Sequence, residues 1–166
     1  MSQPKALLIG YGNPGRGDDG LGPAFAERVA ARNLTGLTVD IDFQLMADHA
    51  LVISEHDLVI FADAGLGMTA PFRFDELTEC VPQNMGSHDV TPEAAVALAQ
   101  LLFHSAPRAF VLAISGDCFG DIREGLSQVA LANLDSAEAY FLNWYAEFCA
   151  DIKPAAPMDT VPQTPG

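Results

Sequence analysis

The fold of this chain is decided by the stretch ALLIGYGNPGRGDDGLGP, residues 6–23. It opens with an unbroken apolar run, which is typical of a β-strand buried on both faces of a sheet. A glycine-rich loop, residues 12–20, follows, and then Pro23, a residue favoured in the first turn of a helix. The stretch therefore predicts a strand, a loop and a helix that begins near Pro23, the first unit of an α/β fold.

Strands and helices are expected to alternate along the rest of the chain. We expect buried strands at 5–11, 57–64 and 109–114, a half-buried strand at 37–45, a weaker edge strand at 71–77, and helices from Pro23, at 47–54, from Pro92 after an N-cap at Thr91, and from Asp135–Ser136. This order predicts an α/β three-layer sandwich, with a central twisted, mostly parallel sheet of about five strands and helices on both faces. In such sheets the functional site lies at the carboxyl ends of the strands.

The amino-acid composition limits the classes of protein to which this chain can belong. The chain has 166 residues, 49% of them hydrophobic and 18% charged, so intrinsic disorder is excluded as the main state and a single domain is expected. We predict one domain over residues 1–152 and a flexible, proline-rich tail over 153–166. Eight Lys and Arg against 22 Asp and Glu give a net charge of −14. Nucleic acids and anionic membrane surfaces are therefore not expected as partners.

The cellular setting is expected to be the cytoplasm. No apolar run approaches the roughly 20 residues that cross a bilayer, and the first residues do not have the pattern of a signal peptide. The three cysteines are widely spaced and form no Cys-x-x-Cys, which argues against a disulfide framework or a thiolate zinc site.

Polar residues that can carry chemistry lie after the predicted strands. Asp18 and Asp19 stand in the first loop, Asp63 closes an otherwise apolar strand, and His88 precedes the helix that begins at Pro92. Because the carboxyl ends of parallel strands meet at one edge, two aspartates and this histidine are expected to form a small site. Such a site suits a divalent ion such as zinc, nickel or manganese, and the residue types alone do not choose the metal.

Other interpretations of the same residues remain open at this point. The first loop contains the dinucleotide fingerprint G-x-G-x-x-G, but the predicted helix begins too late, and carboxylates stand where a phosphate would approach. Asp18 and Asp19 are also suited to helix capping, and Asp63 to a loop hydrogen bond. A nucleophilic pair of Cys118 and His88 is conceivable, whereas a Gly-x-Ser-x-Gly elbow, a His-Glu-x-x-His motif and a P-loop are absent.

The first loop, Gly10-Tyr-Gly-Asn-Pro-Gly-Arg-Gly-Asp-Asp-Gly20, resembles the opening signature of the nickel–iron hydrogenase maturation endopeptidases. The strand end Asp63-Ala64, the pair Ser87-His88 and the segments 109–116 and 125–127 follow in the order that this family shows. The resemblance covers roughly residues 5–150.

This resemblance implies an endopeptidase that removes a C-terminal extension from the precursor of a [NiFe] hydrogenase large subunit, once nickel is inserted. It places the metal-contacting and catalytic residues at Asp19, Asp63 and His88, and it leaves Asp18 without a role. We expect the nickel to arrive with the precursor, the enzyme to be a monomer, and its acidic surface to steer a basic extension. Whether the three residues hold nickel, activate water or do both is left open.

Two further functions are kept as alternatives. One is another metal-dependent peptidase of the same fold, and the other is a non-catalytic chaperone that binds nickel and the precursor without cutting it.

Overall fold

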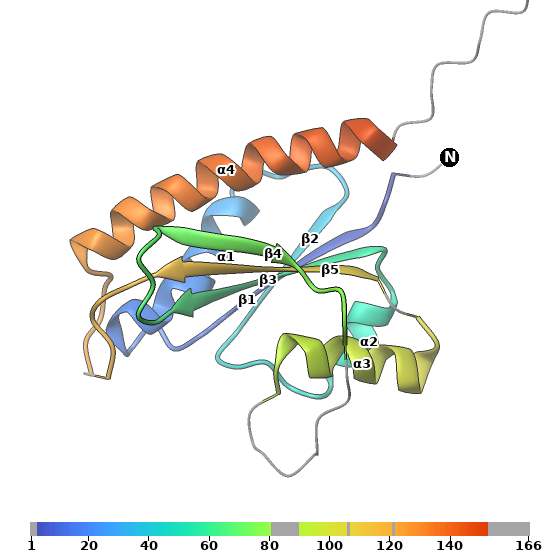
Figure 1. The fold of residues 1–166 in the computed structure, drawn as a ribbon, viewed down its shortest axis with the longest axis horizontal. Helices are drawn as coiled ribbons and strands as arrows, with labels where there is room; N and C mark the ends of the chain where they lie inside the picture. Colours follow the sequence, from blue (N-terminus) through green and yellow to red (C-terminus); the bar gives the residue numbers. More distant parts are fainter. Residues whose placement is uncertain (1–2, 81–89, 106, 121, 153–166) are drawn as a thin grey trace, which may run out of the picture.

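The computed structural model describes residues 3–80, 90–105, 107–120 and 122–152. Their secondary structure alternates as expected, and Figure 1 shows the arrangement. In chain order the elements are β1 (Ala6–Tyr11), the short 3-10 helix η1 (Gly17–Gly20), α1 (Leu21–Ala30), β2 (Leu37–Asp42), α2 (His49–Ser54), β3 (Leu58–Gly65), β4 (Phe72–Glu76), α3 (Pro92–Phe103), β5 (Arg108–Ser115) and α4 (Gln128–Ile152). The predicted tail, 153–166, lies outside the described residues.

The five strands form one sheet in the order β2-β1-β3-β5-β4. Strands β2, β1, β3 and β5 are parallel, and β4 pairs antiparallel with β5 at one edge. Helices α1 and α4 cover one face of the sheet, and α2 and α3 cover the other (Figure 1). The predicted α/β three-layer sandwich with a mostly parallel five-stranded sheet is therefore confirmed.

Two separate cores hold the layers together, because successive residues of a strand point to opposite faces. In β1, Ala6 and Leu8 pack under α1 and α4, whereas Leu7 and Ile9 pack under α2 and α3. All four side chains are fully buried, which accounts for the continuous apolar run in the sequence.

The last helix begins earlier than expected. We predicted a start at Asp135–Ser136, whereas α4 begins at Gln128. Ser127 is the residue that caps it, since its Oγ accepts a hydrogen bond from the Ala130 N–H at 3.1 Å. Asp135 lies within the helix and pairs with Arg28 of α1 at 2.6 Å, which is a surface contact between two helices rather than a cap.

Helix α1 also begins before the predicted residue, at Leu21 rather than Pro23, directly after η1. Gly22 allows this early start, because a Cβ there would collide with the carbonyl oxygens of Tyr11 and Ala62. The first turn of α1 therefore packs directly on the backbones of β1 and β3, which positions the loop before it.

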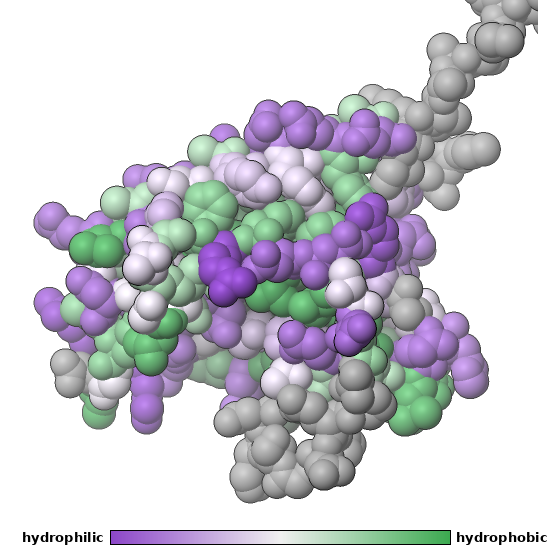
Figure 2. Space-filling view, viewed as in Figure 1, coloured by the Kyte–Doolittle hydropathy of each residue, from purple (hydrophilic) through white to green (hydrophobic). Residues whose placement is uncertain are grey.

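The edge strand β4 is charged on its outer side. Arg73 and Asp75 are exposed and pair at 3.2 Å, and Figure 2 shows a hydrophilic band along this strand. Charged side chains on an edge strand disfavour pairing with another sheet.

Within the described residues, no helix has the length and hydrophobicity needed to cross a membrane.

Candidate active site

The loop between β1 and α1 folds tightly at the carboxyl edge of the sheet. The Asn13 side chain accepts a hydrogen bond from the Gly15 N–H at 2.9 Å, and the Asn13 N–H donates to Oδ2 of Asp19 at 2.8 Å. Gly12 has a φ of +145°, and a Cβ there would collide with the Asp19 carbonyl. The loop thus fixes the Asp19 carboxylate, whose Oδ1 receives no hydrogen bond from any described residue.

Asp63 lies near the carboxyl end of β3, at the point where this strand extends past β1. The pairing of β1 with β3 ends at Gly10↔Ala62, whereas the pairing of β5 with β3 continues to Gly65↔Ser115. We predicted that Asp63 would close the strand, but β3 continues two residues further along β5. Asp63 is therefore the first residue of β3 beyond its ladder with β1.

The charge of Asp19 acts on Asp63 and makes a small contribution to the raised pKa of that carboxyl. The pKa of Asp63 is raised to about 6, mainly because the carboxyl is buried. Hydrogen bonds from the Ala64 N–H and the Tyr11 hydroxyl lower this pKa, and the charge of Asp19 raises it. Neighbouring carboxylates that are poorly hydrated favour a shared proton or a cation between them. A divalent ion at Asp19 and Asp63 stays a prediction from the sequence.

Tyr11 and Glu93 belong to the same region, and neither was singled out from the sequence. Burial raises the pKa of the Tyr11 hydroxyl, with further contributions from Asp63 and from the charge of Glu93 in the first turn of α3. A signal for Tyr11 was available, because Tyr11 ends the first predicted strand, directly before the glycine-rich loop that carries Asp19. Glu93 gave no such signal, since a glutamate near a helix start also serves as a capping residue.

Asp18 has a different role from its neighbour. Its side chain is completely buried and accepts four hydrogen bonds of 2.7–2.9 Å, from the N–H groups of Asp117, Cys118 and Ser127 and from the Ser127 hydroxyl. Burial acts to raise the pKa of Asp18, but these donors lower it below its ordinary value. Asp18 therefore ties the first loop to the loop after β5 and to the start of α4.

Neither aspartate caps a helix through its side chain, so the capping interpretation is wrong.

Acidic and thiol groups of Asp18, Asp117 and Cys118 do lie within 4.8 Å of one another. However, both oxygens of Asp18 are occupied by hydrogen bonds, so this cluster is a hydrogen-bonded junction rather than a metal site.

Cys118 is poorly suited to act as a nucleophile. Its hydrogen bond to Asp117 raises the pKa of the thiol, and burial and the charges of Asp117 and Asp18 raise it further, against an opposing effect of Arg123. Because the thiolate is the reactive form, these surroundings disfavour the alternative in which Cys118 is paired with His88.

His88 lies outside the described residues, so its position relative to Asp19 and Asp63 stays a prediction. The helix after it begins as expected: Pro92 is the first residue of α3, and Oγ1 of Thr91 accepts a hydrogen bond from the Ala94 N–H at 3.1 Å. Val90 packs against the core under α2 and α3, which is the face of β3 that carries Asp63.

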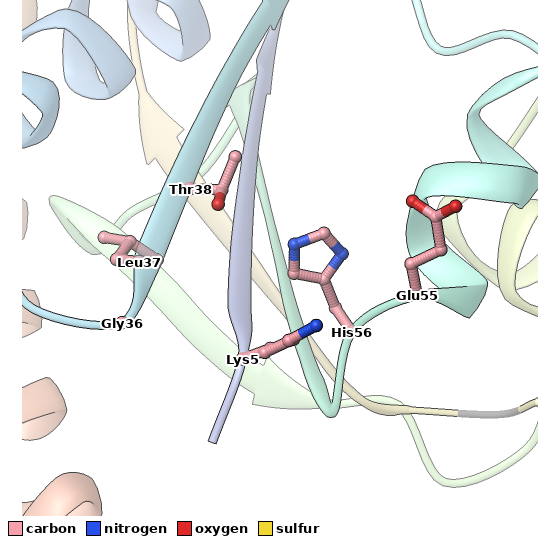
Figure 3. Close-up of a pocket in the computed structure, with 6 residues that line it drawn as sticks. All are labelled: Lys5, Gly36, Leu37, Thr38, Glu55 and His56. Atoms are coloured by element: carbon pink, nitrogen blue, oxygen red, sulfur yellow. The ribbon is translucent and has the colours of Figure 1, made fainter. Parts of the chain in front are cut away.

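A large hollow lies at the opposite end of the sheet from these residues. It has a volume of about 750 Å³ and is drawn in Figure 3. Its lining includes Lys5, just before β1, Leu37, the first residue of β2, and His56, just before β3. These positions mark the amino ends of the strands, so this hollow is separate from the candidate site.

Comparison with known proteins gives structural matches only. No model of a protein family matches the chain, and no curated protein matches it. Among solved structures, the chain is similar to the hydrogenase maturating endopeptidase HybD from E. coli, with a TM-score of 0.67 and 18% identity over 87% of this chain and 93% of that one. It is also similar to the [NiFe] hydrogenase maturation protease HycI from Thermococcus kodakarensis KOD1, with a TM-score of 0.64 and 18% identity over 90% and 95% of the two chains.

A third match comes from an archaeon. The hydrogenase 2 maturation peptidase from Thaumarchaeota archaeon SCGC_AB-539-E09 has a TM-score of 0.62 and 19% identity, over 85% of this chain and 97% of that one. Each comparison spans nearly the whole of both chains, although the identities are low. The chain therefore has the fold of the hydrogenase maturation endopeptidases.

Proposed function

We propose that this chain belongs to the hydrogenase maturation endopeptidases and removes the C-terminal extension from the nickel-loaded precursor of a [NiFe] hydrogenase large subunit. The observation that carries the proposal is Asp63, a partly buried carboxylate with a raised pKa near the carboxyl end of β3 in a sheet with this fold, on which the charge of Asp19 also acts. The loop that presents Asp19 also holds the sequence motif that resembles this family.

Peptide hydrolysis requires a water made nucleophilic and a carbonyl made electrophilic. Asp63, with a pKa of about 6, is ionised at neutral pH and is basic enough to accept a proton from water. Among the described residues, none donates a hydrogen bond to Oδ1 of Asp19. We propose that Asp19, Asp63 and His88 contact the nickel that the precursor carries, and that one of the aspartates serves as the base.

In this proposal nickel is part of the substrate rather than a resident cofactor. The chain offers two carboxylates and an imidazole, a donor set of hard to borderline character that fits nickel without holding it as tightly as thiolates would. Protein purified without added ions should therefore contain well under one equivalent of metal by elemental analysis. A stoichiometric metal in such a preparation would contradict this part of the proposal.

The reaction is tested by intact-mass analysis of a nickel-loaded large-subunit precursor mixed with the protein. The wild type is compared with Asp19→Asn, Asp63→Asn and His88→Ala, and a nickel-free precursor serves as the substrate control. Loss of a C-terminal peptide only with the wild type and only with nickel supports the reaction and the site. Cleavage by all three variants overturns the site, whereas binding without cleavage by the wild type favours the chaperone alternative.

We also propose that the enzyme acts as a monomer in the cytoplasm. Sedimentation velocity checks the first statement, and a concentration-dependent increase in sedimentation coefficient would contradict it.

A further inference from the structure

A shallow groove runs along α1 on the outer side of the loop that presents Asp19. It consists of two adjoining hollows of about 260 and 110 Å³, which share Pro14, Pro23 and Glu27 in their lining. Ile41 and Phe43 border the larger hollow, and Leu126 borders the smaller one. We call these six residues and the space between them the α1 groove.

The apolar side chains at the open end of the groove lack a partner within the described part of the chain. Ile41, near the end of β2, is 41% exposed, and Phe43, which directly follows β2, is 69% exposed. Leu37 and Val39, on the same face of β2, pack against the core under α1. Ile41 continues this apolar row beyond the cover that α1 provides, where a bound chain would contact it.

The size of the groove limits what it accepts. The larger hollow is below the roughly 300 Å³ at which pockets for whole small molecules begin. It suits one or two side chains of an extended peptide rather than a cofactor or a helix. A peptide lying there would also contact Pro14, next to the Asn13 N–H that holds the Asp19 carboxylate.

The charge of the groove indicates which peptide fits. The lining residues include Glu27 and Asp42 and no lysine, arginine or histidine. Among the described residues, Glu27 is exposed and takes part in no ion pair, and the chain as a whole carries a net charge of −14. A cationic side chain on the bound peptide would supply the missing partner for Glu27.

We propose that the α1 groove binds an extended segment of the precursor that carries an apolar side chain next to a lysine or arginine. The apolar side chain packs between Pro14, Ile41 and Phe43, and the basic group pairs with Glu27. This inference rests on the proposed function and adds to it a docking surface outside the pair of catalytic carboxylates.

The test measures both binding and cleavage of the nickel-loaded precursor. A double variant, Ile41→Ser with Phe43→Ser, removes the apolar border, and Glu27→Gln removes the charge. All three positions are exposed, so the variants should fold, which thermal unfolding checks. Matched controls are Leu101→Ser with Leu102→Ser, exposed on α3 across the sheet, and Glu55→Gln at the amino end of the strands.

The double variant should weaken precursor binding and raise KM by at least about tenfold with little change in kcat, because docking rather than chemistry is lost. Glu27→Gln should weaken binding severalfold at low salt and reduce its dependence on ionic strength. Neither control should change binding by more than about twofold.

Three other results for the wild type and the double variant would each support or overturn the proposed docking surface. Normal binding and cleavage by the double variant would overturn the docking surface while leaving the proposed function in place. A wild type that binds the precursor but does not cleave it, with binding lost in the double variant, would support the surface and overturn the function. A double variant that differs from the wild type only in oligomeric state would show that the groove joins two copies of this chain, and would overturn the inference.

Discussion

The electrostatic cost of ionising Asp63 leads to a prediction about stability. The variant Asp63→Asn keeps the shape of the side chain and its carbonyl acceptor for the Ala64 N–H, but it carries no charge. Burial and the charge of Asp19 raise the pKa of Asp63 from 3.8 to about 6, so the folded state binds this proton more tightly than the unfolded state does. We therefore expect Asp63→Asn to be more stable than the wild type at pH 7.

The size of the effect follows from the shift in pKa. A rise from 3.8 to about 6 corresponds to about 3 kcal/mol, since one unit is worth about 1.4 kcal/mol. Asp63 is only partly buried, and screening by water reduces this figure to about 2 kcal/mol. The stability of the wild type falls as the pH rises from about 4 to about 6, because the unfolded state releases the proton first. The two proteins should therefore differ least near pH 4 and most above pH 6.

The measurement is urea unfolding of both proteins from pH 4 to pH 8, in the presence of a chelator so that no metal stabilises the carboxylates. Asp75→Asn serves as the control, because Asp75 is exposed on β4 and its pair with Arg73 contributes less than about 1 kcal/mol. An Asp63→Asn variant that is less stable than the wild type at pH 7, or a difference that does not vary with pH, would refute the reasoning. The hydrogen bonds to Asp63 would then outweigh its burial.

Three further variants test the parts of the fold that hold the site, each by urea unfolding at pH 7. Asp18→Ala should lose at least about 3 kcal/mol, because four buried donors lose their acceptor; a loss below 1 kcal/mol would contradict this. Ser127→Ala should lose about 1–2 kcal/mol together with the cap of α4, and an unchanged midpoint would count against that role. Gly22→Ala should lose about 2 kcal/mol or more by forcing α1 away from Tyr11 and Ala62, and an unchanged midpoint would contradict this close packing.

The sequence predicted the sheet well because its signals are local. Continuous apolar runs identified β1, β3 and β5, and the alternating pattern identified β2. The parallel order placed the loop with Asp19 and the end of β3 with Asp63 at one edge, and in the structure the charge of Asp19 acts on Asp63. The rule that sites form at the carboxyl ends of parallel strands placed both residues at this edge without any knowledge of side-chain positions.

The helix starts were predicted less well, because their causes are not local. Pro23 and Asp135 are good start signals, but α1 and α4 begin before them. Gly22 fits only because its backbone approaches β1 and β3, and Ser127 is held at the start of α4 partly by its hydrogen bond to Asp18. Contacts between residues far apart in sequence decided both boundaries.

The separation of roles between Asp18 and Asp19 depends on the turn in which they lie. In the 3-10 helix η1, one residue turns the chain by about 120°, so adjacent side chains point in different directions. Asp18 points inward, where three N–H groups and a hydroxyl keep it ionised and fixed, whereas Asp19 accepts a hydrogen bond from the Asn13 N–H. The buried carboxylate anchors three segments of the chain around the loop. Because that anchor is strong, the loop can hold the Asp19 carboxylate in place although its charge raises the pKa of Asp63, and we expect this arrangement to favour a cation at the proposed site.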